Sequence, residues 1–140
     1  TILKPNRDEL SALVRLPIRS DVDVVAAARK LLGKETQLVV VTAGDRGAWA
    51  VSEDGEYHVP ALPIDVVNTA GAGDALAAGI AAGIARGWPW QDGLRLGIAA
   101  AAAVCLTPGT AICCRADVEH LMKRVRLFPI PSGVDADLPD

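Results

Sequence analysis

Residues 38–41 form an unbroken apolar run, Leu-Val-Val-Val, which limits the folds that this chain can adopt. It follows a segment, residues 21–32, with the apolar spacing of an amphipathic helix, with Ser20 as a predicted N-cap and Gly33 as a predicted stop. A short β-branched strand with no polar position is typical of a strand buried on both faces of a parallel sheet. The chain is therefore expected to pack helices against such a sheet.

The remaining segments predict an α/β fold of layered helices and sheet, mostly parallel with an antiparallel hairpin extension. Residues 48–52 and 56–59 flank Glu53-Asp54-Gly55, a hairpin signal. Further strands are expected at residues 1–3 and 64–67. A short helix is expected after residue 6, with Leu10, Leu13 and Val14 on its apolar face. Three more helices are expected at residues 72–87, 90–106 and 116–126.

Length, composition and charge narrow the class of protein. With 140 residues and 51% hydrophobic content, one globular unit is expected, followed by a disordered tail at residues 128–140. A net charge of −3 without a run of Lys or Arg argues against nucleic acid. The longest apolar runs fall short of the ~20 residues of a membrane span. Three cysteines, two of them adjacent, fit neither a disulfide framework nor a metal site, which predicts a cytoplasmic protein with cysteines that act as small apolar side chains.

Candidate chemistry concentrates in residues 68–74, Asn-Thr-Ala-Gly-Ala-Gly-Asp, between a predicted strand and a long helix. Gly71 and Gly73 allow a ligand to approach the peptide groups directly. Free N–H groups at a helix N-terminus form an anion site that can hold a phosphate. An ionised Asp74 beside such a site could take the proton from an attacking hydroxyl while the amides stabilise the transferring group.

Other interpretations of this segment remain open. Asp74 can simply be a favourable charge in the first turn of a helix, and the two glycines can form a tight turn with close helix packing. A dinucleotide site is disfavoured because Leu76 stands where the third glycine of G-x-G-x-x-G belongs.

The segment Gly71-Ala72-Gly73-Asp74 resembles the G-A-G-D signature of the ribokinase-like carbohydrate kinases, also called the PfkB family. The resemblance implies that Asp74 is the catalytic base and that Gly71, Ala72 and Gly73 supply the anion hole. It also implies a ribokinase-like αβα fold.

Residues 4–10, Lys-Pro-Asn-Arg-Asp-Glu-Leu, are similar to the N-x-x-E segment of the same family. Asn6 and Glu9 match it position by position, and the K-P-N opening is typical of the phosphofructokinase and tagatose-6-phosphate kinase branch. The resemblance places both residues near magnesium-bound phosphates, Glu9 through water, and Lys4 near the nucleotide. A helix cap made by Asn6 and Glu9 is an alternative that can hold at the same time.

Two further segments are similar to nucleotide-contacting parts of the family. Thr42, Gly44 and Gly47 match its T-x-G-x-x-G-A turn, against which the nucleotide rests. The segment at residues 106–110, with Gly109, resembles a P-G segment near the nucleotide base. The ordered matches extend over residues 1–127, which are expected to form the nucleotide-binding, catalytic C-terminal half of the domain.

Taken together, the resemblance implies ATP- and Mg²⁺-dependent phosphoryl transfer to a hydroxyl of a sugar or sugar phosphate, as in 6-phosphofructokinase, 1-phosphofructokinase or tagatose-6-phosphate kinase. Asn68 stands where many ribokinases carry an Asp associated with potassium, so monovalent-cation activation is not expected. Family members are about twice as long, which predicts either self-association or dependence on the N-terminal half. The alternative is a nucleotide-binding or assembly module without catalysis.

Overall fold

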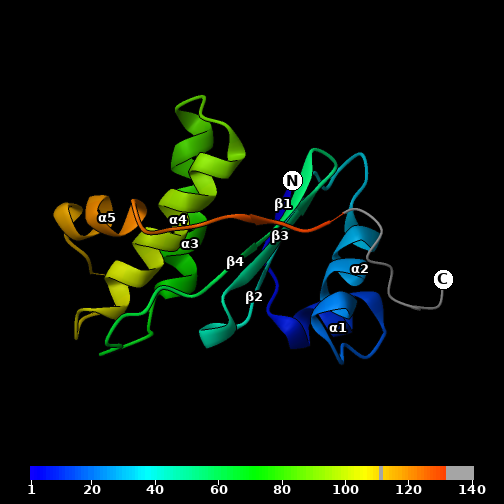
Figure 1. The fold of residues 1–140 in the computed structure, drawn as a ribbon, viewed down its shortest axis with the longest axis horizontal. Helices are drawn as coiled ribbons and strands as arrows, with labels where there is room; N and C mark the ends of the chain where they lie inside the picture. The colour runs from blue at the N-terminus through cyan, green and yellow to red at the C-terminus, as the bar shows by residue number, and fades with distance from the viewer. Residues whose placement is uncertain (111, 132–140) are drawn as a thin grey trace. The chain divides into compact units, whose positions relative to one another are not determined.

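The computed structural model describes residues 1–110 and 112–131 (Figure 1). These residues pack into two compact units: unit 1 is Thr1–Ala61 with the segment that begins at Leu127, and unit 2 is Leu62–Arg126. Length and composition predicted a single unit. The helices of unit 2 instead bury small residues against one another and so make a core of their own.

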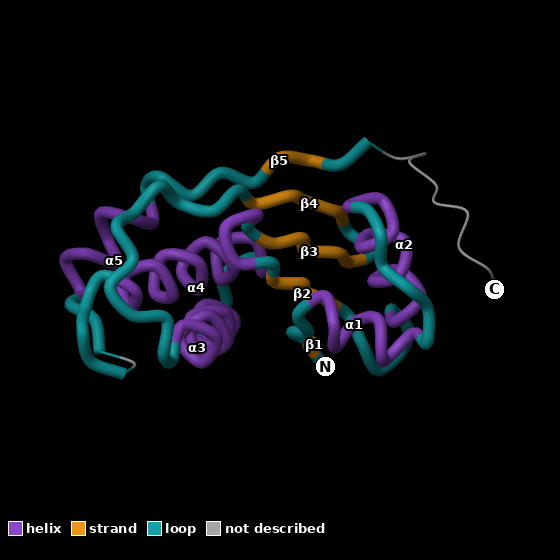
Figure 2. The backbone as a smooth tube through the Cα atoms, turned by 90° about the horizontal axis from the view of Figure 1, so that it is seen from below, coloured by secondary structure: helices purple, strands orange, loops and turns teal. Residues whose placement is uncertain are grey.

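Unit 1 contains a mixed sheet in which the strands follow one another in sequence order (Figure 2). Its strands are β1 (Ile2–Leu3), β2 (Leu38–Thr42), β3 (Ala48–Ser52), β4 (Gly55–Val59) and β5 (Phe128–Pro129). Together with the helices, this mixed sheet confirms the α/β class. The predicted excess of parallel strands is wrong for the described residues, because only β1 and β2 pair in parallel. Short turns follow β2 and β3, and short turns can join only antiparallel neighbours.

Two helices of unit 1 begin at capping boxes, where the sequence predicted a cap by Asn6 and Glu9 and an N-cap at Ser20. In α1 (Arg7–Val14) the cap is Asn6, and in α2 (Asp21–Leu31) it is Ser20. The Ser20 hydroxyl accepts the Asp23 amide at 3.2 Å, and the Asp23 carboxylate accepts the Ser20 amide at 3.1 Å. Each box provides partners for two N–H groups that the helix leaves without one.

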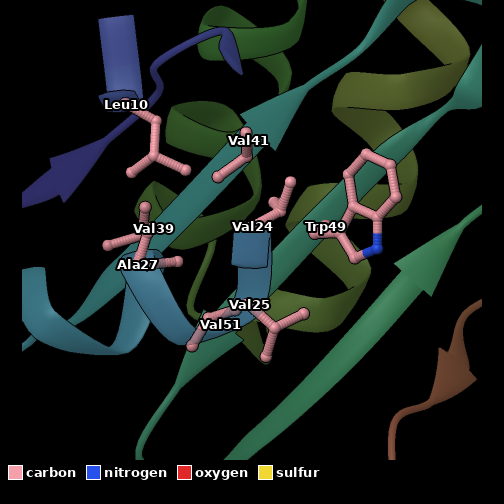
Figure 3. Packing of buried hydrophobic residues seen from close by; sticks show 9 residues of the cluster. Leu10, Val24, Val25, Ala27, Val39, Val41, Trp49 and Val51 are labelled. Atoms are coloured by element: carbon pink, nitrogen blue, oxygen red, sulfur yellow. The ribbon is translucent and has the colours of Figure 1, made fainter. Parts of the chain in front are cut away.

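The core of unit 1 lies between these helices and one face of the sheet (Figure 3). Leu10 from α1 and Val24 from α2 meet Val39, Val41 and Val51 of the sheet, and all five are 0% exposed. The predicted burial of the apolar run is confirmed, since every residue from 38 to 41 is at most 3% exposed. By contrast, Leu13 does not belong to the buried face of α1, because it is 55% exposed.

Unit 2 contains α3 (Ala72–Ala85), α4 (Trp90–Cys105) and α5 (Arg115–Met122). Helices α3 and α4 approach each other at glycines: a Cβ on Gly83 would lie 2.5 Å from the Gly93 Cα, and a Cβ on Gly79 would lie 2.6 Å from the Gly97 nitrogen. Such distances leave no room for a side chain. Gly79 and Gly83 therefore pack α3 against another helix; the sequence had suggested that these two glycines pack a helix against the sheet, and within unit 2 their partner is α4.

Three expectations about the chain's elements change with the structure. Residues 64–67 form no strand; Val66 and Val67 are instead exposed in an irregular segment. The helix predicted at residues 116–126 ends at Met122. Part of the predicted disordered tail, Phe128–Pro129, forms β5 and pairs with Tyr57 and His58 of β4. Residues 132–140 of that tail lie outside the described residues. Within the described ranges, no helix has the length and apolar character of a membrane span.

The glycine contact predicts a large difference between two Gly→Ala variants. In Gly79→Ala the new methyl group meets the backbone of α4, so the free energy of unfolding should fall by about 1–3 kcal/mol. In Gly33→Ala nothing lies within 4 Å of the new methyl group, and stability should change by less than about 0.5 kcal/mol. Thermal or urea unfolding measures both. Equal losses in the two variants would contradict the close approach of α3 and α4.

Candidate functional site

The predicted site residues fall into two groups, one in each unit. Unit 1 carries the K-P-N-x-x-E segment and the glycine turn, and unit 2 carries the G-A-G-D loop and the P-G segment. The residues in unit 1 are Lys4, Asn6, Glu9, Thr42, Gly44 and Gly47, and those in unit 2 are Gly71, Ala72, Gly73, Asp74 and Gly109.

In unit 1 the parallel pairing of β1 and β2 brings the two motifs together. The Thr42 amide donates to the Pro5 carbonyl at 3.0 Å, and Asn6 forms an isolated parallel bridge with Thr42. The carboxyl ends of parallel neighbours lie at the same edge of a sheet, which is where ligands bind in many α/β proteins. The K-P-N segment and the glycine turn therefore share one edge.

The cap predicted for Asn6 and Glu9 is present. The Asn6 side-chain oxygen accepts the Glu9 amide at 2.9 Å, and Glu9 Oε2 accepts the Asn6 amide at 2.8 Å. Both side chains belong to exposed residues. The cap uses one carboxylate oxygen of Glu9, so a contact with a solvated metal ion through the other is compatible with it. That contact stays a prediction.

A groove of about 490 Å³ lies beside this cap. Lys4 and Glu9 give it two opposite charges, while the rest of its lining is apolar. Its lining residues are Leu3, Lys4, Pro5, Glu9, Ala12 and Leu13. Sequence reasoning missed Ala12 and assigned Leu13 to the core. The groove is within the size range of small-molecule sites, and it places Lys4 and Glu9 in one hollow.

The glycine turn in unit 1 depends on its backbone conformation. Gly47 has φ 85°, and a Cβ on it would lie 2.8 Å from the Ala61 nitrogen. Gly44 also has a positive φ, 54°, but nothing lies within 4 Å of the Cβ position. The Ala43 amide closes the turn by donating to the Gly47 carbonyl at 2.9 Å. The turn therefore needs glycine at position 47 for structural reasons alone, and the nucleotide contact stays a prediction.

In unit 2 the G-A-G-D loop opens helix α3 and leaves peptide groups free. Gly71 is the N-cap, with φ 86° and no side-chain cap. The Ala72 amide donates to the Thr69 carbonyl at 3.2 Å, and the Ala75 amide donates to the Gly71 carbonyl at 2.9 Å. Between them, the amides of Gly73 and Asp74 have no hydrogen-bond partner among the described residues. Two adjacent N–H groups at the positive end of the helix dipole therefore remain for an anion.

This arrangement changes the expected set of donors. The Ala72 amide was predicted to belong to the anion hole, but the loop itself uses it. The Asp74 amide, which sequence reasoning did not include, is available instead. Only a helix boundary at Ala72 makes Asp74 a first-turn residue whose N–H lacks a partner, and motif matching does not resolve that detail.

The Asp74 side chain lies in the first turn of α3 and is exposed. Within residues 1–110 and 112–131, it has neither a hydrogen bond nor an ion pair. Gly73 is exposed and Gly71 is half-buried, so packed side chains do not seal the loop. The loop thus presents a carboxylate and two open amides within one helical turn, which is the chemical requirement for a base beside an anion site.

Asn68 holds the loop from the side. Its Nδ2 donates to the Pro108 carbonyl at 3.1 Å, and its Oδ1 accepts the Ala70 amide at 3.0 Å. The amide side chain thereby joins the G-A-G-D loop to the P-G segment that contains Gly109. An Asp at this position would lack the donor for Pro108. The nucleotide contact predicted for Gly109 is not tested by these bonds.

The described residues contain no group of three or more His, Cys, Asp or Glu side chains placed to hold a metal ion. Magnesium commonly keeps several waters and uses one or two carboxylates together with substrate phosphates. A single carboxylate such as Glu9 therefore fits a magnesium ion that arrives with a nucleotide better than it fits a resident metal site.

Comparison with known proteins settles the family. A family model described as "pfkB family carbohydrate kinase" matches residues 1–117. The chain belongs to this family. It is 37% identical over 123 residues to an ATP-dependent 6-phosphofructokinase isozyme 2 of Mycobacterium tuberculosis, covering 87% of this chain and 36% of the relative. It is 36% identical over 111 residues to a 1-phosphofructokinase of Haloferax volcanii, covering 79% of this chain and 36% of that protein.

The solved structure of phosphofructokinase-2 from Escherichia coli in complex with potassium matches this chain with a TM-score of 0.81 at 31% identity. The match covers 88% of this chain and 40% of that one. The ribokinase-like fold expected from the motifs is therefore confirmed. The chain spans 36% to 40% of the length of these relatives.

The two hydrogen bonds of Asn68 predict different behaviour in two variants. Asn68→Ala removes both bonds, so the Ala70 amide should exchange with deuterium faster than in the unchanged chain. Asn68→Asp keeps the acceptor and loses only the donor, so Ala70 should stay protected while stability falls by about 1 kcal/mol. Amide exchange followed by mass spectrometry or NMR measures this. Equal exchange at Ala70 in all three proteins would contradict the role of Asn68.

Proposed function

We propose that this chain supplies the nucleotide site and the catalytic base of an ATP-dependent sugar kinase. The observation that supports the proposal most strongly is the first turn of α3, where the open amides of Gly73 and Asp74 adjoin an exposed carboxylate. Membership of the pfkB family of carbohydrate kinases supports phosphoryl transfer as the chemistry that these groups would serve.

In the proposed reaction, the Asp74 carboxylate accepts the proton of the sugar hydroxyl as its oxygen attacks the terminal phosphorus of ATP. A new P–O bond forms to the sugar oxygen, and the bond between the terminal phosphorus and the bridging oxygen of ADP breaks. The amides of Gly73 and Asp74 donate to the oxygens of the transferring group, where negative charge is spread in the transition state. The positive end of the α3 dipole also stabilises this negative charge.

The resemblance also assigns nucleotide-contacting residues to unit 1, and the geometry within that unit is compatible with the assignment. Thr42, Gly44 and Gly47 present a turn at the same sheet edge as Asn6, so the backbone there can lie against the nucleotide. Lys4 in the adjoining groove would offer a positive charge to the phosphates. Glu9 would orient a water of a magnesium ion that neutralises phosphate charge when bound with ATP.

The proposed acceptor is a phosphorylated ketohexose. Two relatives support this choice: the 6-phosphofructokinase isozyme of M. tuberculosis and the 1-phosphofructokinase of H. volcanii. The K-P-N opening at Lys4 and the Asn at position 68 agree with this branch of the family. Potassium activation is not part of the proposal, because Asn68 uses its side chain to join two loops.

A second candidate is a nucleotide-binding or assembly module without catalysis. The share of the relatives that this chain spans favours it, because more than half of their length has no counterpart here. β1 also lies at the end of the sheet and has a neighbour on one side only among the described strands. Such an edge can pair with a further strand, from another chain or another copy.

The assignment of Asp74 predicts a selective loss of turnover. In the full-length gene product, Asp74→Asn should lower kcat by about 10²–10⁴-fold, the range for loss of a general base, and leave ATP affinity nearly unchanged. Asp65→Asn is the matched control, because Asp65 is also exposed in unit 2 but lies outside the loop. Steady-state kinetics with fructose 6-phosphate measure both variants. Near-normal turnover by Asp74→Asn would remove Asp74 from the role of base.

The two candidate functions predict different activities for the 140-residue chain when it is assayed by itself. We expect the 140-residue chain to bind ATP weakly and to phosphorylate little fructose 6-phosphate, because it spans less than half of the relatives. A coupled ADP-release assay with ATP, Mg²⁺ and a panel of sugar phosphates measures this. Robust turnover by the chain alone would contradict the expectation and exclude the non-catalytic module.

A further inference from the structure

Two adjacent cysteines lie on the surface of unit 2, outside the site described above. Cys113 and Cys114 are both exposed, between the P-G segment and helix α5. The sequence predicted that the cysteines serve as small apolar side chains, and exposure of this pair shows that packing is not their role. Cys105, at the end of α4, is partly buried and fits the prediction better.

A disulfide between neighbouring cysteines is unfavourable. Disulfides join residues whose Cα atoms are about 4.4–6.8 Å apart, whereas adjacent Cα atoms are about 3.8 Å apart across a trans peptide. Closing that ring strains the bond and makes it easy to reduce. The pair is therefore expected to remain a dithiol under reducing conditions, with two sulfurs held on neighbouring residues.

We propose that Cys113 and Cys114 form a chelating dithiol site for a soft, thiophilic centre that bonds two sulfurs at once, such as a trivalent arsenical or monovalent copper. Soft ions prefer thiolate ligands over oxygen and nitrogen. Once one sulfur is bound, the second is supplied by the next residue at a high effective concentration, so the pair binds far more tightly than either thiol alone.

One sulfur of the pair has a hydrogen-bond donor at the start of α5. The Asp117 amide donates to Cys114 Sγ at 3.5 Å, so the sulfur already accepts a hydrogen bond at the start of α5. The neighbouring Arg115 carries a positive charge, although its guanidinium is paired with Glu119 at 2.7 Å. Cys105 differs, because burial raises the pKa of its thiol and keeps a smaller fraction ionised at neutral pH.

The dithiol adjoins the segment that supports the G-A-G-D loop. The Thr107 hydroxyl donates to the Ile112 carbonyl at 2.6 Å, directly before the pair, and Pro108 accepts the Asn68 side chain. Thr107 and Pro108 are consecutive residues, so these two hydrogen bonds connect Ile112, which precedes the cysteine pair, to Asn68, which holds the loop.

The probe for the first arm of the test is phenylarsine oxide. Two As–S bonds form, the As–O double bond breaks, and the oxygen leaves as water with the two thiol protons, so arsenic stays trivalent. The reduced chain should take up one arsenic and lose two of its three titratable thiols, measured by intact mass and thiol titration. The second arm uses Cu⁺ under anaerobic conditions, where two thiol protons are released for each ion bound.

Single substitutions separate chelation from ordinary thiol reactivity. Cys113→Ser and Cys114→Ser should each weaken binding by at least about 100-fold, because the chelate is lost. Cys105→Ser should bind like the unchanged chain. Both cysteines of the pair are exposed, so serine should leave the fold intact, which circular dichroism checks. If only one probe binds, the site is specific for arsenic or for copper accordingly, and the chelating role still holds. No 1:1 binding of either probe, or full binding by a single-serine variant of the pair, overturns the proposal.

Reactivity toward an alkylating agent gives an independent measurement on the same thiols. With iodoacetamide near neutral pH, Cys113 and Cys114 should be modified before Cys105. Cys105 is partly buried, and burial raises the pKa of its thiol, so both access and ionisation slow its reaction near neutral pH. Peptide mapping of the modified chain measures the order. Equal rates at all three cysteines would contradict the contrast between the exposed pair and the partly buried thiol.

Discussion

Unit 1 depends on the position of β2 between β1 and β3. Its residues 38–41 are at most 3% exposed, so a slip by one residue would exchange the side chains on its two faces. The register is therefore fixed, and the parallel pairing with β1 carries the K-P-N segment to Thr42. Two motifs that are far apart in the sequence share one sheet edge as a consequence.

Unit 2 holds the G-A-G-D loop at the N-terminus of α3 in a conformation that leaves peptide N–H groups unpaired among the described residues. Glycine contacts let α3 and α4 approach at backbone distance, and the N-terminus of α3 then carries no side-chain cap. Asn68 supports the loop through two hydrogen bonds that leave the Gly73 and Asp74 amides unused. The helix forgoes a cap, which is typically worth about 1 kcal/mol, where an anion can take its place.

Much of this arrangement could be predicted from sequence, and the reasons for the exceptions are physical. The buried strand and the helix caps follow from local chemistry, so the run at residues 38–41, the N-cap at Ser20 and the cap made by Asn6 and Glu9 were assigned correctly. Two predictions were wrong: the strand at residues 64–67 and the burial of Leu13. Both properties depend on neighbours in the tertiary structure, which the local sequence does not specify. For the same reason sequence could not show that Ala72 loses its amide to Thr69, or that two cysteines are exposed.

In the proposed function, the first-turn amides of α3 bind the phosphates of a nucleotide. A titration of the ¹⁵N-labelled chain, followed by NMR, observes these groups one by one even when binding is weak. With ATP, we expect shifts at Gly73 and Asp74 that saturate, and much smaller shifts at both with adenosine, which lacks the phosphates. Unmoved Gly73 and Asp74 signals in saturating ATP, or equal shifts with adenosine, would contradict it.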